Sequence, residues 1–173
     1  MKLESKDIAG WIGKAGKTER TKEFEYPHIL GFFVLITYGS KFILNQIREL
    51  ARDPRADTSP QGGERILEPK LNQGYARWII RGWSGLTLER LEEIIPGVLE
   101  NAMETAEDQA PEGTPVDVEK LKEAEVEFSE ETCIEMMDSS VEFSNWVVSV
   151  SSKTKHYADI GEKKAEQFEN LSK

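Results

Sequence analysis

The residues that could support nucleophilic or metal chemistry in this chain are few and scattered. His28 and His156 are the only histidines, and neither lies at metal-ligand spacing from other ligand types. Cys133 is the only cysteine, so no disulfide can form within the chain, and a small buried side chain is favoured over a nucleophile. No zinc-protease, nucleotide-binding, serine-hydrolase or calcium-loop motif occurs. The sequence therefore predicts no metal site and no cofactor.

Carboxylates are the one abundant reactive group, with 32 Asp and Glu in 173 residues. Glu92 with Glu93, or Glu130 and Glu131 with Glu135, could be paired as a general acid and base. Such a pair needs a concave, partly dry site that separates the two pKa values. These residues fall on the polar faces of predicted helices, so solvated faces are the favoured interpretation. We expect no catalytic residue, and hence no enzyme.

The charge of the chain is unevenly distributed. Residues 1–87 carry 14 Lys and Arg against 10 Asp and Glu, whereas residues 88–142 carry 3 against 18, and residues 143–173 carry 5 against 4. The net charge of −15 in the middle block disfavours binding to nucleic-acid phosphates. It could attract a basic partner, but maintaining solubility is the favoured interpretation.

Length and hydropathy favour one soluble domain in a reducing compartment. The first ten residues contain no apolar run of the signal-peptide type, and the longest apolar stretch, residues 29–38, is too short to span a bilayer. We expect a cytosolic protein with no membrane partner.

The apolar periodicity predicts a mainly α-helical fold, a compact bundle of about five to six short helices with one N-terminal strand or β-hairpin as a minor α+β component. Residues 1–25 are interpreted as an N-terminal arm, either mobile or a short helix. Residues 26–108 form an N-terminal helical part with a strand at 29–38. A linker at 109–117 leads to a C-terminal helical part, 118–173, which we expect to pack with the first as one domain.

Capping residues place several of the helices. Ser40, Thr87 and Ser129 are predicted N-caps. The helix after Ser40 has an apolar face of Phe42, Ile43, Ile47, Leu50 and Ala51. A second helix is predicted over about 68–81, followed by a turn at 82–86, a third helix that stops near Pro96 and a fourth over 97–108. After Ser129, the side chains expected to point inward are Cys133, Met136 and Met137, and Val141, Phe143, Trp146, Val147 and Val150 continue the apolar surface. Residues 153–173 are expected to form a charged helix.

Aromatic side chains are the candidate partner contacts, because tryptophan is enriched at binding hot spots. Core packing is favoured for Trp78 and Trp146, and Trp83 is expected to fill a helix junction. Trp11, in a sparse polar segment, is the best single candidate for an exposed docking residue. The complete set of predicted partner-binding residues is Trp11, Ile12, Trp83, Phe143, Trp146 and Phe168.

Three segments in their order along the chain resemble the tail assembly chaperones of long-tailed bacteriophages. An apolar strand leads into a short helix in GFFVLITYGSKFILNQIRELARD, and a helix closes on a Trp-Gly-Leu turn in ARWIIRGWSGLTLERLEEIIP. An acidic capping stretch and a Phe-Trp helix follow in VEFSEETCIEMMDSSVEFSNWVVSVS.

The resemblance implies a non-virion assembly factor without an active site. Such proteins bind the tail tape-measure protein, a long, apolar-rich helical chain, and keep it soluble until tail-tube subunits polymerise around it. The implied partners are therefore the tape-measure protein and also the tail-tube protein, with homo-oligomers as a further expectation. The implied location is the cytoplasm of the bacterial host, with the protein absent from the mature virion.

Two other classes remain open. The acidic block favours a small inhibitor or immunity-type protein that caps a basic partner surface. A virion structural protein, such as a tail-completion subunit, is the third alternative.

Overall fold

The computed structural model describes residues 19–55, 65–111 and 115–157. These residues form a mainly helical fold with a three-stranded antiparallel sheet near the N-terminal end, as the sequence predicts, and they contain seven α-helices rather than five or six. The strands are β1 (Thr21–Glu25), β2 (Phe33–Thr37) and β3 (Ile80–Ser84). The helices are α2 (Lys41–Ala51), α3 (Glu68–Trp78), α4 (Leu88–Ile94), α5 (Val98–Gln109), α6 (Val118–Lys122), α7 (Glu130–Ser139) and α8 (Val141–Ser152), followed by a short 3-10 helix, η2 (Thr154–Tyr157).

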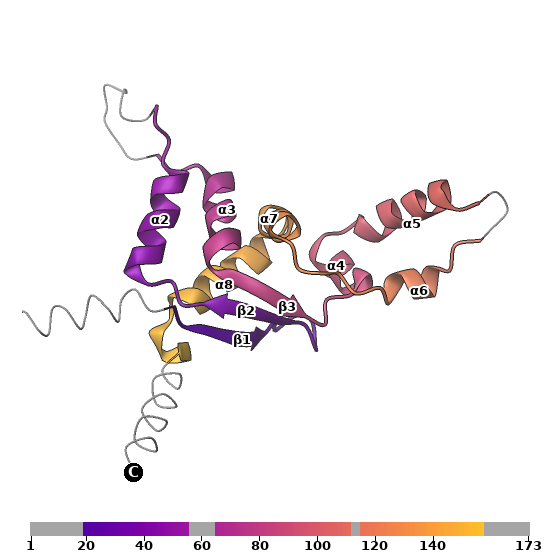
Figure 1. Cartoon of the computed structure of the whole chain (residues 1–173), viewed down its shortest axis with the longest axis horizontal. Helices are drawn as coiled ribbons and strands as arrows, with labels where there is room; N and C mark the ends of the chain where they lie inside the picture. Colours follow the sequence, from indigo (N-terminus) through magenta and orange to yellow (C-terminus); the bar gives the residue numbers. More distant parts are fainter. Residues whose placement is uncertain (1–18, 56–64, 112–114, 158–173) are drawn as a thin grey trace, which may run out of the picture.

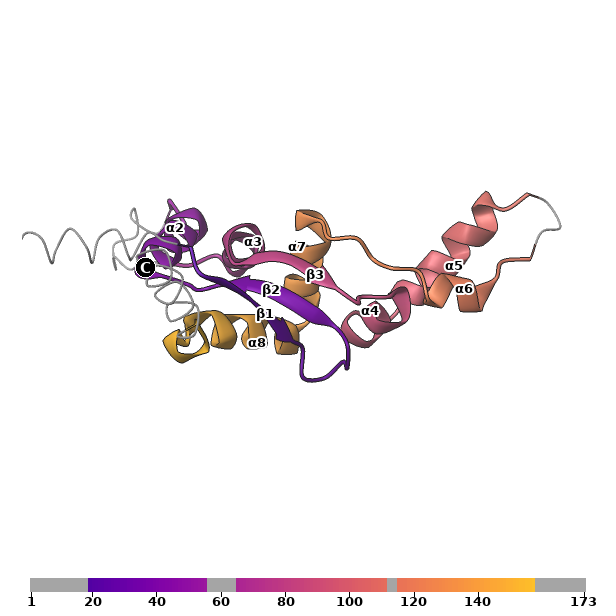
Figure 2. The ribbon, with the colours of Figure 1, turned by 60° about the horizontal axis from the view of Figure 1, so that its bottom comes forward.

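The sheet has the strand order β1-β2-β3, and both neighbouring pairs are antiparallel. The predicted strand at 29–38 is confirmed over Phe33–Thr37, whereas residues 27–31 form the turn of the β1–β2 hairpin. Val34 and Ile36 in β2 are buried and Leu35 between them is 37% exposed, which is the alternation of a strand with one covered face. Helix α8 packs against β2 and lies on the opposite side of the sheet from α2 and α3, and α7 contacts both α3 and α8 (Figure 2).

Strands β1 and β2 form the β-hairpin that the sequence allowed as an alternative to a single strand, whereas β3 was not expected, and β1 lies in a segment predicted to be an arm or helix. The prediction of an arm or helix over 1–25 is wrong for Thr21–Glu25, which pairs with β2; residues 1–18 lie outside the described residues. The predicted helix over 68–81 is also too long, because α3 ends at Trp78 and the predicted turn is strand β3. Local composition does not favour either strand, and both form because they pair with β2.

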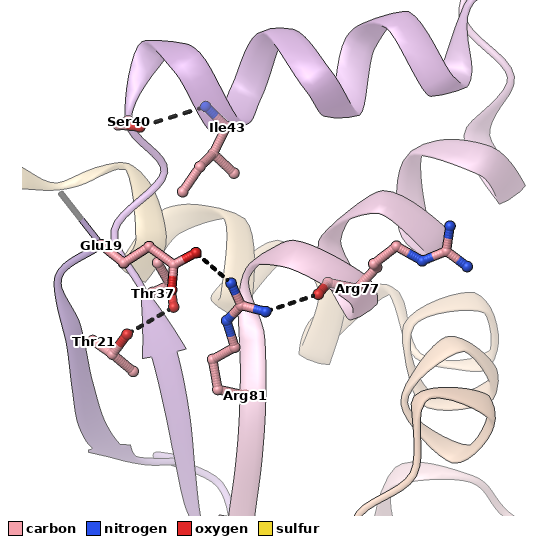
Figure 3. Close-up of polar contacts among 7 residues, drawn as sticks. All are labelled: Glu19, Thr21, Thr37, Ser40, Ile43, Arg77 and Arg81. Carbon is pink, nitrogen blue, oxygen red and sulfur yellow. Dashed lines mark hydrogen bonds and ion pairs between the residues drawn. The ribbon is translucent and has the colours of Figure 1, made fainter. Parts of the chain in front are cut away.

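Polar contacts hold the end of the sheet where these strands meet the helices (Figure 3). The hydroxyls of Thr21 and Thr37 share a hydrogen bond of 2.9 Å across β1 and β2. The Arg81 guanidinium donates to Glu19 Oε1 at 2.8 Å and to the carbonyl oxygen of Arg77 at 3.2 Å. Arg81 therefore joins the end of α3 to the residues that precede β1.

The predicted caps are confirmed, since Ser40, Thr87 and Ser129 each accept a hydrogen bond from the backbone N–H three residues later. Two side chains differ from the predicted apolar faces: Phe42 is 49% exposed and Val141 is 73% exposed. Both occupy the first turn of their helix, where Ile43 and Phe143 face the core instead.

The core lies between the sheet and helices α2, α3, α7 and α8. Cys133, Met136 and Met137 on α7 are buried in it, as predicted. Burial, and secondarily the charge of Glu130, raises the pKa of the Cys133 thiol to about 12. The thiol is therefore protonated at neutral pH, and its complete burial confirms Cys133 as a core residue.

Helices α5 and α6 lie at one end of the molecule, away from the sheet (Figure 1). The turned view shows the same separation, with α4 between them and the sheet (Figure 2). The fold thus consists of a packed body and an extension that begins at α4.

The contact between α2 and α3 provides a test of the fold. A Cβ at Gly74 would lie 2.8 Å from Ile47 Cγ2, whereas a Cβ at Gly82 would meet no atom within 4 Å. We predict that Gly74→Val lowers the free energy of unfolding by about 2 kcal/mol or more through overpacking. Gly82→Val, on an open position of β3, should leave it within about 0.5 kcal/mol of wild type. Urea unfolding of both variants measures this, and equal stabilities would contradict the α2–α3 packing.

Candidate partner-binding surface

The extension begins and ends at one place in the body. The Leu88 N–H donates to the carbonyl oxygen of Ala124 at 3.0 Å, and the Val126 N–H donates to that of Leu86 at 2.8 Å. An antiparallel bridge between Thr87 and Glu125 lies between these two bonds. Residues 88–124, here called the acidic arm, therefore leave and rejoin the body through a closed base.

Trp83 forms part of this base. Its indole Nε1–H donates to the carbonyl oxygen of Val126 at 2.7 Å, and its ring meets that of Phe128 edge-on with centroids 4.8 Å apart. The side chain is half-buried on β3 and packs against the core. The indole holds residues 126–128 against β3, which leaves only part of its surface for a partner.

Arg90 connects the arm to the β1–β2 hairpin. Its guanidinium donates to the carbonyl oxygens of Gly31 and Gly85. Gly85 has a φ of 71°, and a Cβ at this position would overlap the carbonyl oxygen of Gly31. Glycine is therefore required in the Trp-Ser-Gly-Leu segment by a close approach of two backbones.

The arm is anchored by α4 and exposed beyond it. Leu91 and Ile94 on α4 are buried in the core, whereas α5 and α6 contain no buried residue. Helix α5 packs chiefly against α4 and α6. A twelve-residue helix with no buried residue is unusual, because most helices in folded domains are stabilised by packing an apolar face.

Helix α5 nevertheless has an apolar stripe. The stripe consists of half-buried residues at helical spacing, continued by the C-cap: Val98, Leu99, Ala102, Met103, Ala106 and Ala110. The exposed carboxylates of Glu100, Glu104 and Glu107 border it on one side. A shallow hollow lies along this border, lined by Leu99 and Met103 together with those three glutamates and Glu92.

The other border of the stripe carries no charge. Here Asn101, Thr105 and Gln109 line a second, open hollow together with Val98, Ala102 and Ala106. The Thr105 hydroxyl is occupied by a hydrogen bond of 2.8 Å to the carbonyl oxygen of Asn101. The stripe thus has an acidic edge and a neutral edge.

Glu92 fixes the start of α5. Its Oε2 accepts from the Leu99 N–H at 2.7 Å and its Oε1 from the Gly97 N–H at 2.9 Å. Hydrogen bonds from Leu99 and Gly97 lower the pKa of the Glu92 carboxyl below its ordinary value. The predicted solvated carboxylate is thus a structural cap between α4 and α5.

Of the predicted partner-binding residues that the structure describes, Phe143 and Trp146 lie together, with ring centroids 6.0 Å apart, whereas Trp83 contacts Val126 and Phe128. Phe143 is completely buried against the rings of Tyr26 and Phe32, so in this structure it is a core residue, not a contact surface. Trp146 is half-buried beside Tyr26. Trp11, Ile12 and Phe168 lie outside the described residues, and their assignment stays a prediction.

Two strongly exposed apolar side chains lie elsewhere. Leu30 in the hairpin turn is 85% exposed and Val141 at the start of α8 is 73% exposed. His28 Nε2 lies 3.2 Å from Glu142 Oε1, so these two chain segments are neighbours. The surface around Leu30 and Val141 has fewer apolar side chains than the stripe of α5, and among the described residues no row of like charges lies beside it.

The surface on α5 was not identified as a site from the sequence. The helix itself was predicted, and its stripe and the acidic block were visible signals, but an apolar stripe ordinarily indicates a buried face. The α5 stripe is recognisable as a surface only because the described neighbours, α4 and α6, cover it in part and bury none of its residues completely.

Comparison of the chain with protein-family models, with curated proteins and with solved structures gave no match. The resemblance to tail assembly chaperones therefore stays a prediction. Within the three described ranges, no helix has the length and apolar content needed to cross a bilayer. Within the same ranges, no three His, Cys, Asp or Glu side chains gather as metal ligands.

Glu92 gives a pH-dependent test of the arm. Because the pKa of Glu92 is lowered in the folded state, its carboxylate stabilises the folded start of α5 fully at pH values above the unfolded-state pKa. This stabilisation is lost as the pH falls through the folded-state pKa. We predict that Glu92→Gln reduces hydrogen-exchange protection of the Gly97 and Leu99 amides at neutral pH. As the pH falls through the folded-state pKa of Glu92, protection in the wild type should fall toward that of the variant.

Glu93→Gln is the matched control, because Glu93 is exposed on the same helix. It should leave the protection factors at neutral pH unchanged. Equal protection in wild type and Glu92→Gln at neutral pH would show that the carboxylate does not hold α5.

Proposed function

We propose that this chain is a tail assembly chaperone that binds the tape-measure protein of a long-tailed phage by reversible contact and without catalysis. The observation that carries the proposal is α5, a folded helix whose apolar stripe is half-buried and none of whose residues is fully buried. A stripe of this kind offers helix-to-helix packing to a client. The order of the three sequence segments supplies the identity of that client.

The physical task fits the arm. A long helical client exposes apolar faces before the tube forms around it, and such faces aggregate unless they are covered. The arm supplies an apolar surface, and it carries 11 Asp and Glu against 3 Lys and Arg, which favours solubility of a complex. Release during assembly requires only moderate affinity, which suits the small area of a single helix face. The proposal places the protein in the host cytoplasm and outside the mature virion.

The carboxylates of Glu100, Glu104 and Glu107 on α5, here called the acidic row, also favour a second candidate, an inhibitor that caps a basic partner surface. The two functions differ in what drives binding. Binding to a basic surface depends on charge and weakens steeply as the salt concentration rises. Binding to apolar helix faces persists at high salt.

Co-expression tests the proposed function. We predict that the tape-measure protein of the same phage is recovered in the soluble fraction only when this chain is co-expressed, and that the two co-elute on gel filtration. The reason is that covered apolar faces no longer self-associate. A tape-measure protein that stays insoluble, or that is equally soluble alone, would refute the function.

A further inference from the structure

We propose that the acidic edge of the α5 stripe selects an amphipathic client helix whose own apolar stripe is bordered by a row of Lys or Arg. This inference rests on the proposed function for the existence of a helical client. It adds the location of the contact on this chain and the chemistry that the client must carry.

The first argument is the asymmetry of α5. Glu100, Glu104 and Glu107 follow one another at spacings of four and three residues, so their side chains form one row along the helix. They line the same hollow as Leu99 and Met103. A partner side chain that enters this hollow meets apolar groups and carboxylates together, which is the environment that suits the apolar stem and charged head of lysine or arginine.

The second argument is that two of the three described cations of the arm, Arg90 and Lys122, bond to groups other than the acidic row. The Arg90 guanidinium is bonded to the carbonyl oxygens of Gly31 and Gly85. The Lys122 Nζ lies 2.9 Å from Glu119 Oε1 on α6. Neither is bonded to the acidic row, which therefore keeps its capacity to pair with cations from a partner.

The third argument concerns energy. Pairs between exposed side chains contribute little individually, so the row by itself would not hold a client. The apolar stripe has no such limitation, because its half-buried side chains lose their remaining exposed area on contact. Binding therefore depends on the stripe, and the charges determine which helices bind and how they are aligned.

Fluorescence anisotropy with defined peptides tests the selectivity. The probe is a labelled helical peptide of about 18 residues with a Leu and Ala stripe and Lys at spacings of four and three along one edge. The control peptide carries Gln at those Lys positions. At about 50 mM salt, the full chain should bind the Lys peptide at least about tenfold more tightly than the Gln peptide. At about 500 mM salt, the affinities for the two peptides should lie within about threefold of each other.

Two pairs of variants locate the site. Ala106→Glu places a carboxylate inside the stripe and retains helix propensity, and it should weaken binding of both peptides by about tenfold or more. Gln46→Glu, which adds the same charge at an exposed position on α2, is the control and should change affinity by less than about threefold.

The second pair separates the row from net charge. Glu100→Gln, Glu104→Gln and Glu107→Gln combined should abolish the preference for the Lys peptide. The same number of charges is removed by Glu23→Gln, Glu49→Gln and Glu135→Gln combined, at exposed positions on β1, α2 and α7, and the preference should persist. Loss of the preference in both triple variants would overturn the proposal in favour of a nonspecific charge effect.

The remaining outcomes distinguish this inference from the proposed function. If Ala106→Glu still solubilises the tape-measure protein as the wild type does, the α5 site is refuted and the chaperone function stands. If the wild type forms dimers that Ala106→Glu dissociates, the stripe binds a second copy and the client site is refuted. Circular dichroism and thermal unfolding of each variant ensure that lost binding is not lost folding.

Discussion

The hydrogen-bonded base of the arm is the constraint on which the rest of this structure depends. Two backbone bonds, a bridge and the Trp83 indole bring residues 83–88 and 124–128 together. Because the chain returns to the point it left, α7 and α8 can complete the core that the sheet and α3 begin. Beyond α4, the described part of the segment between contributes no fully buried residue to the core, although Val98 at the start of α5 still packs against it. A helix can then present apolar side chains without a place for them inside the molecule.

The composition of the arm follows from this freedom. The part of the apolar stripe that remains exposed would promote self-association, and the like charges on its acidic edge oppose that contact. The same charges repel one another at spacings of three and four along α5, at a cost of a few tenths of a kcal/mol for each pair. A basic client helix would relieve this repulsion while it covers the stripe, so both properties of α5 favour one kind of partner.

Much of the fold could be predicted because its signals are local. Ser40, Thr87 and Ser129 begin helices through bonds to amides three residues away, and the inward set on α7 follows from helical spacing. Strands β1 and β3 could not be predicted in this way. Each is five residues long and mostly polar or glycine-containing, and it becomes a strand through pairing with β2. That pairing is a long-range property which single-sequence patterns do not report.

The candidate site was less predictable, for a related physical reason. Aromatic residues suggest contact surfaces, but Phe143 fills the core and Trp83 is bonded to Val126, so these side chains stabilise the fold itself. They belong to the segments that carry the family resemblance, which end at Pro96 and resume at Val126. The exposed parts of the arm, α5 and α6, lie between those two limits. If the flanking segments specify the architecture, the intervening helices can differ in length and charge without disturbing the fold of the body. Specificity for one client can then be encoded in α5.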